Sequence, residues 1–137
     1  MRSQVHTYRT GNADLVLDLT RDCARFVAGQ GDGLLHLFVP HATAGLAILE
    51  TGAGSDDDLI SALRDLLPAD DRWQHGHGSR GHGRSHVMPA LIAPYASVPV
   101  IDDGLALGTW QSICLVDLNI DNHERDVRFS FLPGDKH

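Results

Sequence analysis

Cysteine is scarce in this chain of 137 residues, which contains only Cys23 and Cys114. The two show no paired spacing, and neither lies beside a histidine in the sequence. A disulfide is therefore disfavoured, and we interpret both cysteines as reduced residues that pack in the interior. Reduced cysteines are typical of cytoplasmic proteins.

Long apolar runs are also missing. No stretch of about eighteen uninterrupted apolar residues occurs, so the sequence predicts no membrane-spanning segment. Residues 1–6 lack the apolar run that a secretory signal peptide requires. We therefore expect a cytoplasmic protein with no membrane partner.

Positive charge is in deficit, because 11 Lys and Arg residues face 18 Asp and Glu residues for a net charge of −7. Without a basic surface, nucleic acid is a poor candidate partner, and any anionic substrate must be bound by a local group. The length, with 42% hydrophobic and 21% charged residues, indicates one globular domain over residues 1–137.

The apolar pattern predicts many short strands and few helices. The first two strands, at 4–10 and 13–19, are expected to pair across the turn Gly11-Asn12. Further strands are expected at 34–39, 42–50, 97–101, 105–107, 112–118 and 126–131, and helices from residue 21 to Gly29, over 55–67 and as a turn at 86–92. Because strands and helices do not alternate regularly, we predict an α+β fold, a compact and mainly antiparallel sandwich or barrel with two or three helices.

Several local details follow from residue type. Thr20 and Ser55 are expected to cap the two helices by accepting hydrogen bonds from free backbone N–H groups. The Asp-Gly step in residues 102–104 is expected to supply the unusual backbone angles of a tight hairpin turn. Trp110 is expected to pack in a core or an interface.

Residues 73–86, here called the histidine loop, contain four of the nine histidines, separated mainly by glycines. Neutral imidazole is the commonest metal ligand, and glycine lets the backbone bring several rings round one point. The alternative is a solvated, flexible loop with only a fortuitous affinity for nickel or zinc. The composition of the loop does not decide between the two.

The whole sequence resembles the YjbQ-like family, whose members are also labelled secondary thiamine-phosphate synthases. The resemblance rests on Val-Pro-His-Ala-Thr-Ala-Gly-Leu at 39–46, the acidic Glu50, the pair His75 and His86, and Leu-Ala-Leu-Gly-Thr-Trp-Gln at 105–111. It implies a homotrimer of α+β subunits built round antiparallel sheets. It also implies polar clefts near the subunit boundaries that bring His41, His75 and His86 together.

The sequence departs from the family pattern at several positions. Ala42 and Leu49 replace a usual threonine and asparagine, and residues 117–125 replace a Glu-Phe-Asp-Gly-Pro-Arg run, with Asp117 keeping the charge. The histidine loop adds His77 and His82 where relatives more often carry acidic residues. These histidines favour transition metals over magnesium, which prefers oxygen ligands.

From this resemblance we expect a metal site formed by His41, His75 and His86. Three imidazoles leave a fourth position open for water or a substrate oxygen, as in catalytic zinc sites. Zinc is the first expectation, and magnesium is an alternative if the substrate is a pyrophosphate.

The remaining candidates surround that metal. Glu50 or Asp57 is expected to orient a ligand histidine or to act as a general base, and Arg125 joins them in the catalytic set. A small phosphorylated molecule is expected to meet arginine, hydroxyl and glycine backbone groups. These candidates are Thr43, Arg84, Gly108, Thr109 and Gln111.

Three functions remain open. The resemblance implies coupling of a pyrimidine pyrophosphate to a thiazole phosphate, with the metal and arginine stabilising the departing pyrophosphate. The same histidines could instead activate water to hydrolyse a small phosphorylated substrate. A trimer that binds a metal or anion without turnover is the third.

Overall fold

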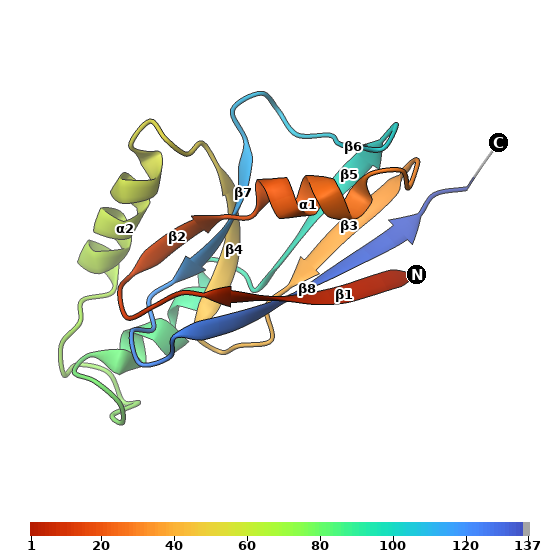
Figure 1. The fold of residues 1–137 in the computed structure, drawn as a ribbon. Helices are drawn as coiled ribbons and strands as arrows, with labels where there is room; N and C mark the ends of the chain where they lie inside the picture. The colour runs from red at the N-terminus through yellow and green to blue at the C-terminus, as the bar shows by residue number, and fades with distance from the viewer. Residues whose placement is uncertain (136–137) are drawn as a thin grey trace.

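A computed structural model describes residues 1–135 and shows strands arranged as two antiparallel sheets (Figure 1). Sheet A has five strands in the order β1-β8-β3-β5-β6, and sheet B has three in the order β2-β7-β4. The strands are β1 (Arg2–Arg9), β2 (Leu15–Asp18), β3 (Gly33–Phe38), β4 (Ala44–Leu49), β5 (Tyr95–Ile101), β6 (Gly104–Leu105), β7 (Ser112–Asp117) and β8 (Glu124–Pro133).

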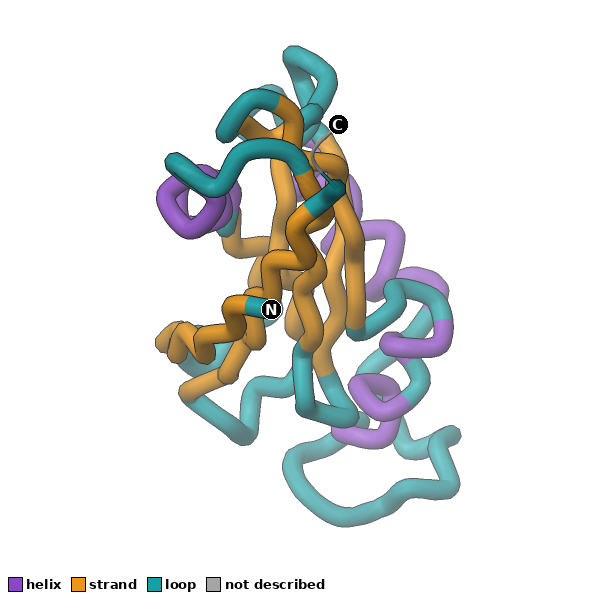
Figure 2. Tube along the Cα trace, turned by 90° about the vertical axis from the view of Figure 1, so that its right-hand side faces the viewer, coloured by secondary structure: helices purple, strands orange, loops and turns teal. Residues whose placement is uncertain are grey.

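The helices are α1 (Thr20–Val27) and α2 (Ser55–Leu66), with two short 3-10 helices, η1 (His82–His86) and η2 (Met88–Ala90). The two sheets curl into a half-barrel, which confirms the predicted α+β, mainly antiparallel fold. The turned view in Figure 2 places the strands between one helix on one side and the remaining helical segments on the other.

Strand β7 is the centre of sheet B and is buried on both faces, as expected for residues 112–118. On one face, Ile113 and Leu115 belong to the main core, which also takes in α1 and the inner face of sheet A. On the other face, Val116 packs in a smaller core with Leu63 of α2 and Met88 of η2. This second core holds the end of the histidine loop against sheet B.

The expected pairing of the first two strands is wrong. The partner of β1 is β8 and the partner of β2 is β7, so the turn at residues 11–12 passes from one sheet to the other. Both segments have the residue pattern expected of a strand, but that pattern does not identify the partner strand.

Other local predictions also need correction. Thr20 does not cap α1; its hydroxyl accepts the Ile113 N–H at 2.9 Å, while the Asp18 carboxylate accepts the Thr20 N–H at 2.8 Å. No side chain caps α2, whose N-cap residue is Gly54 rather than Ser55.

The hairpin turn and Trp110 also differ from expectation. The positive φ angles of the turn fall on Asp102 and Asp103, at 50° and 69°, rather than on Gly104. Trp110 is 73% exposed and contributes to neither core, so the core alternative is wrong, and packing in an interface between chains stays a prediction. Cys23 and Cys114 are free and buried, as predicted.

Gly45 lets the segment after η2 lie directly on β4. A Cβ atom at this position would lie 2.0 Å from the Ile92 carbonyl oxygen, so a side chain would push the two apart. The neighbouring Leu46 N–H donates to the Ala93 carbonyl at 2.8 Å. This contact fixes the chain just beyond the histidine loop.

Within residues 1–135, no helix has both the length and the apolar character needed to cross a membrane.

Candidate metal centre

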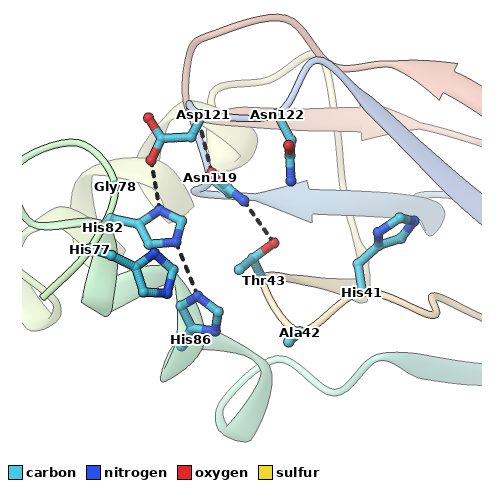
Figure 3. Close-up of a pocket in the computed structure, with 10 residues that line it drawn as sticks. All are labelled: His41, Ala42, Thr43, His77, Gly78, His82, His86, Asn119, Asp121 and Asn122. Atoms are coloured by element: carbon cyan, nitrogen blue, oxygen red, sulfur yellow. Dashed lines mark hydrogen bonds and ion pairs between the residues drawn. The ribbon is translucent and has the colours of Figure 1, made fainter. Parts of the chain in front are cut away.

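Three histidines of the histidine loop meet at one point. One ring nitrogen from each of His75, His82 and His86 lies within 4.8 Å of the other two. The Nε2 atoms of His82 and His86 are 3.0 Å apart, and the rings of His75 and His86 stack at 3.8 Å. The ring of His77 lies beside that of His75, with centroids 3.9 Å apart. Figure 3 shows the three histidines of this loop that line the pocket, at 77, 82 and 86.

Small residues allow the loop to fold this tightly. Gly81 has φ +75°, which few other residues adopt, and immediately precedes η1. Gly83 packs so closely that a Cβ atom there would lie 2.5 Å from the Cβ of Trp73. The Trp73 indole in turn donates to the Pro68 carbonyl at 2.8 Å, which anchors the start of the loop. The glycines therefore provide close packing and not flexibility alone.

The cluster is chemically suited to a metal ion. Burial and the neighbouring imidazoles lower the pKa values of His75 and His86, which favours the neutral rings that coordinate metals. The Nε2 atom of His75 is buried and has no hydrogen-bond partner among the described residues. Tetrahedral zinc, with bonds of about 2.0–2.1 Å, separates its nitrogen ligands by about 3.3 Å. The 3.0 Å between the Nε2 atoms of His82 and His86 is close to that separation.

A pocket of about 370 Å³ opens next to this cluster (Figure 3). Besides three of the loop histidines, its walls come from the chain before β4 and from the connection between β7 and β8. Its lining residues are His41, Ala42, Thr43, His77, Gly78, His82, His86, Asn119, Asp121 and Asn122.

His41 lies in the pocket wall but outside the group of three. Its Nε2 atom accepts the backbone N–H of Asp126 at 2.9 Å. Burial and the nearby Arg125 guanidinium lower the pKa of His41, so the ring is neutral and carries its proton on Nδ1. The structure thus brings His75 and His86 together as expected, but His82 completes the group in the place expected for His41.

Both candidate arginines are bound to buried carboxylates. Arg125 is fully buried and its Nε lies 2.7 Å from the Asp117 carboxylate. Arg84 places one guanidinium nitrogen 2.9 Å from each carboxylate oxygen of Asp14. Neither arginine is among the residues that line the pocket. Of the phosphate-binding candidates, only Thr43 lines it, and its hydroxyl accepts a hydrogen bond from Asn119 at 3.1 Å.

The other candidates lie elsewhere in the subunit. Glu50 directly follows the C-terminal end of β4, whereas His41 precedes the N-terminal end of the same strand. Asp57 lies in the first turn of α2, beside a different cavity. The motif residues Gly108, Thr109 and Gln111 belong to the exposed loop between β6 and β7. Within that loop the Gln111 side-chain oxygen accepts the Gly108 N–H at 2.8 Å. Within one subunit these residues lie away from the histidine cluster.

The sequence does not predict three of the residues that form this site, which are His82, Asp121 and Asn119. The family pattern gives His82 only as an additional histidine, and the structure places its ring against that of His86. Asp121 holds His82, with a carboxylate oxygen 2.8 Å from Nδ1. Asn119 supports Thr43. Nothing in the sequence distinguishes Asp121 and Asn119 from ordinary loop residues.

Comparison with known proteins agrees with the fold and with the extent of the resemblance. The family model described as UPF0047 protein YjbQ-like matches residues 4–134. A UPF0047 protein of Mycobacterium bovis is 57% identical over 119 residues, which cover 87% of this chain and 92% of the relative. A UPF0047 protein of Archaeoglobus fulgidus is 29% identical over 113 residues, 82% of this chain and 88% of the relative.

Solved structures share the architecture. A hypothetical protein of Aeropyrum pernix superimposes with a TM-score of 0.87 at 29% identity, covering 98% of this chain and all of the other. A protein of unknown function from Sulfolobus solfataricus gives a TM-score of 0.88 at 23% identity, covering 97% of each chain. The latter likeness concerns the fold alone.

The burial of Arg125 leads to a prediction about stability. Arg125→Met leaves the Asp117 carboxylate buried without its counter-charge, so the free energy of unfolding should fall by about 3–5 kcal/mol. Arg21→Met is the matched control, because Arg21 is exposed on α1, away from the outer face of sheet A; its effect should stay within about 0.5 kcal/mol. Urea unfolding measures both. Equal losses in the two variants would show that the ion pair does not stabilise the fold.

Proposed function

The chain belongs to the UPF0047 family of YjbQ-like proteins, and we propose that it binds one divalent transition-metal ion through His75, His82 and His86. The observation that carries this proposal is the approach of three ring nitrogens to within 4.8 Å. The unpartnered Nε2 of His75 supports it, because a buried polar atom without a partner is costly unless something else satisfies it.

The ligand set favours zinc over magnesium. All three ligands are imidazoles, which suit zinc, copper, nickel and iron, whereas magnesium requires oxygen ligands. The Asp121 carboxylate contacts His82 and is not one of the three proposed ligands. Three protein ligands leave a position for water or a substrate oxygen, and bound zinc would supply a Lewis acid and a more acidic water there.

The adjoining pocket would receive a small molecule. The neutral ring of His41 has an Nδ1–H group to donate, and the amide of Asn122 supplies further polar atoms. Among residues 1–135, no lysine or arginine lines the pocket, so the metal would be its main source of positive charge for a phosphate. A pyrophosphate carries more negative charge than a single phosphate and would need more positive charge in the pocket to bind. The geometry therefore favours metal-assisted hydrolysis of a small phosphorylated substrate over the coupling reaction.

The metal site predicts a definite stoichiometry. Untagged protein, stripped with chelator and reloaded with zinc, should retain close to one ion per chain by elemental mass spectrometry. The triple variant His75→Ala, His82→Ala, His86→Ala should retain none, because the three substitutions remove all the proposed ligands. His41→Ala should still bind the ion. Loss of zinc in His41→Ala with retention in His82→Ala would instead favour the set His41, His75 and His86.

The reaction class can be tested with two sets of substrates. Zinc-loaded protein should release 4-nitrophenol from 4-nitrophenyl phosphate, and the triple histidine variant should release no more than zinc in buffer. A parallel assay supplies hydroxymethylpyrimidine pyrophosphate and thiazole phosphate separately and together. Product formed only when both are present would favour the coupling reaction. No zinc-dependent turnover in either assay would favour a protein that binds metal without catalysis.

We also propose that copies of the chain assemble into the trimer that the resemblance implies. The supporting observation is the outer face of sheet A, whose strand register brings exposed apolar side chains together. These side chains are Val5, Leu34, Phe38, Tyr95, Ile101 and Leu132. An apolar face of this kind is typical of a surface that a partner covers.

Analytical ultracentrifugation tests this assembly. The wild type should sediment with three times the mass of one chain. Phe38→Glu should shift the protein toward the monomer, because it places a charge in the middle of the apolar face. Leu66→Glu is the control, since Leu66 is exposed on α2, away from sheet A. A wild type that sediments as a monomer would contradict the proposal.

A further inference from the structure

We infer that Asp121 is a positioning residue that prepares His82 to bind the metal through Nε2. This inference rests on the proposed metal-binding function. One Asp121 carboxylate oxygen lies 2.8 Å from His82 Nδ1 and also accepts hydrogen bonds from the Ser79 N–H and hydroxyl, both at 3.0 Å. Figure 3 shows Asp121 on the side of the His82 ring away from His86.

The contact determines which nitrogen of His82 carries a proton. A carboxylate only accepts hydrogen bonds, so the Nδ1 atom of His82 must be its protonated nitrogen. In the neutral ring Nε2 is then unprotonated, and this is the atom that faces His86. A histidine that binds metal through one nitrogen commonly donates its other N–H to a carboxylate, which fixes the ring and increases its basicity.

The contact between His82 and His86 is consistent with this assignment. Because Nε2 of His82 is unprotonated, the 3.0 Å contact requires His86 to donate its Nε2 proton to it. A hydrogen bond thus connects the two nitrogen atoms that the ion would connect when bound. Binding of the ion through Nε2 of His86 would require that ring to change tautomer, so that its proton lies on Nδ1, while His82 already has the tautomer that the metal needs.

Asp121 could instead act only as a tether for the histidine loop, through its hydrogen bonds to Ser79. The two roles differ in which contact matters. Ser79→Ala removes the hydroxyl hydrogen bond but keeps the contact with His82. Asp121→Asn keeps a similar shape but replaces the carboxylate with an amide, which no longer fixes the His82 tautomer. Asp71→Asn makes the same change of charge at an exposed residue next to the loop, whose carboxylate lies 3.8 Å from Arg80.

The first test is zinc affinity, measured by competition with a chelator of known affinity. Asp121→Asn should weaken zinc binding by about 10–100-fold, the usual effect of removing such a carboxylate. Asp71→Asn and Ser79→Ala should bind within about threefold of the wild type. Equal affinity for Asp121→Asn and the wild type would overturn the inference, and so would equal weakening in Asp121→Asn and Ser79→Ala. Absence of zinc binding in the wild type would overturn the proposed function instead.

The second test observes the tautomer without metal. In metal-free protein labelled with nitrogen-15 histidine, NMR should show His82 protonated at Nδ1 and unprotonated at Nε2. Asp121→Asn should change this pattern, whereas Ser79→Ala and Asp71→Asn should keep it. A wild-type His82 protonated at Nε2 alone would contradict the inference even if Asp121→Asn bound zinc weakly.

Discussion

The buried ion pair between Arg125 and Asp117 joins the two sheets at the end where the pocket opens. Asp117 ends β7 in sheet B and Arg125 lies near the start of β8 in sheet A, and their charged groups are 2.7 Å apart with almost no exposure to solvent. The same guanidinium contacts the Asn119 carbonyl, in the connection that carries Asp121. Removal of either charge would leave the other buried and unpaired, so the geometry of this end of the molecule depends on both.

This pairing also affects the chemistry of the pocket. Asp117 and Asp14 engage the two arginines that a phosphate would otherwise meet. In a chain with a net charge of −7, the pocket then has no fixed cation of its own among the described residues, although histidines surround it. An ion held by the histidine cluster would compensate for this. The arginines are therefore used inside the fold, and the proposed metal would supply the positive charge that the pocket needs for a phosphate.

The sequence predicts the fold better than it predicts the site. Apolar periodicity identifies β7, α2 and β8 because each buries a regular pattern of side chains, and it reports how those patterns lie along the chain. It does not report partners, so the first two strands were paired with each other instead of with β8 and β7.

The site residues divide in the same way. The composition of the histidine loop indicates a cluster of imidazoles, which the structure contains, but the choice of His41 over His82 came from the family pattern. A backbone N–H donated by Asp126 to His41 cannot be read from residue types, and neither can the contact between Asp121 and His82. Such contacts depend on how loops from different sheets meet.

All three proposed ligands come from one segment of twelve residues, 75–86, that contributes little to the main core. Neither hydrophobic core includes His75, His82 or His86, and the Nε2 atoms of His82 and His86 are within hydrogen-bond distance of each other. Binding and release of the proposed ion would consequently not require unfolding of the sheets. Occupancy would then follow the free metal concentration around the protein, as it does in a reversible receptor, rather than being fixed once during folding.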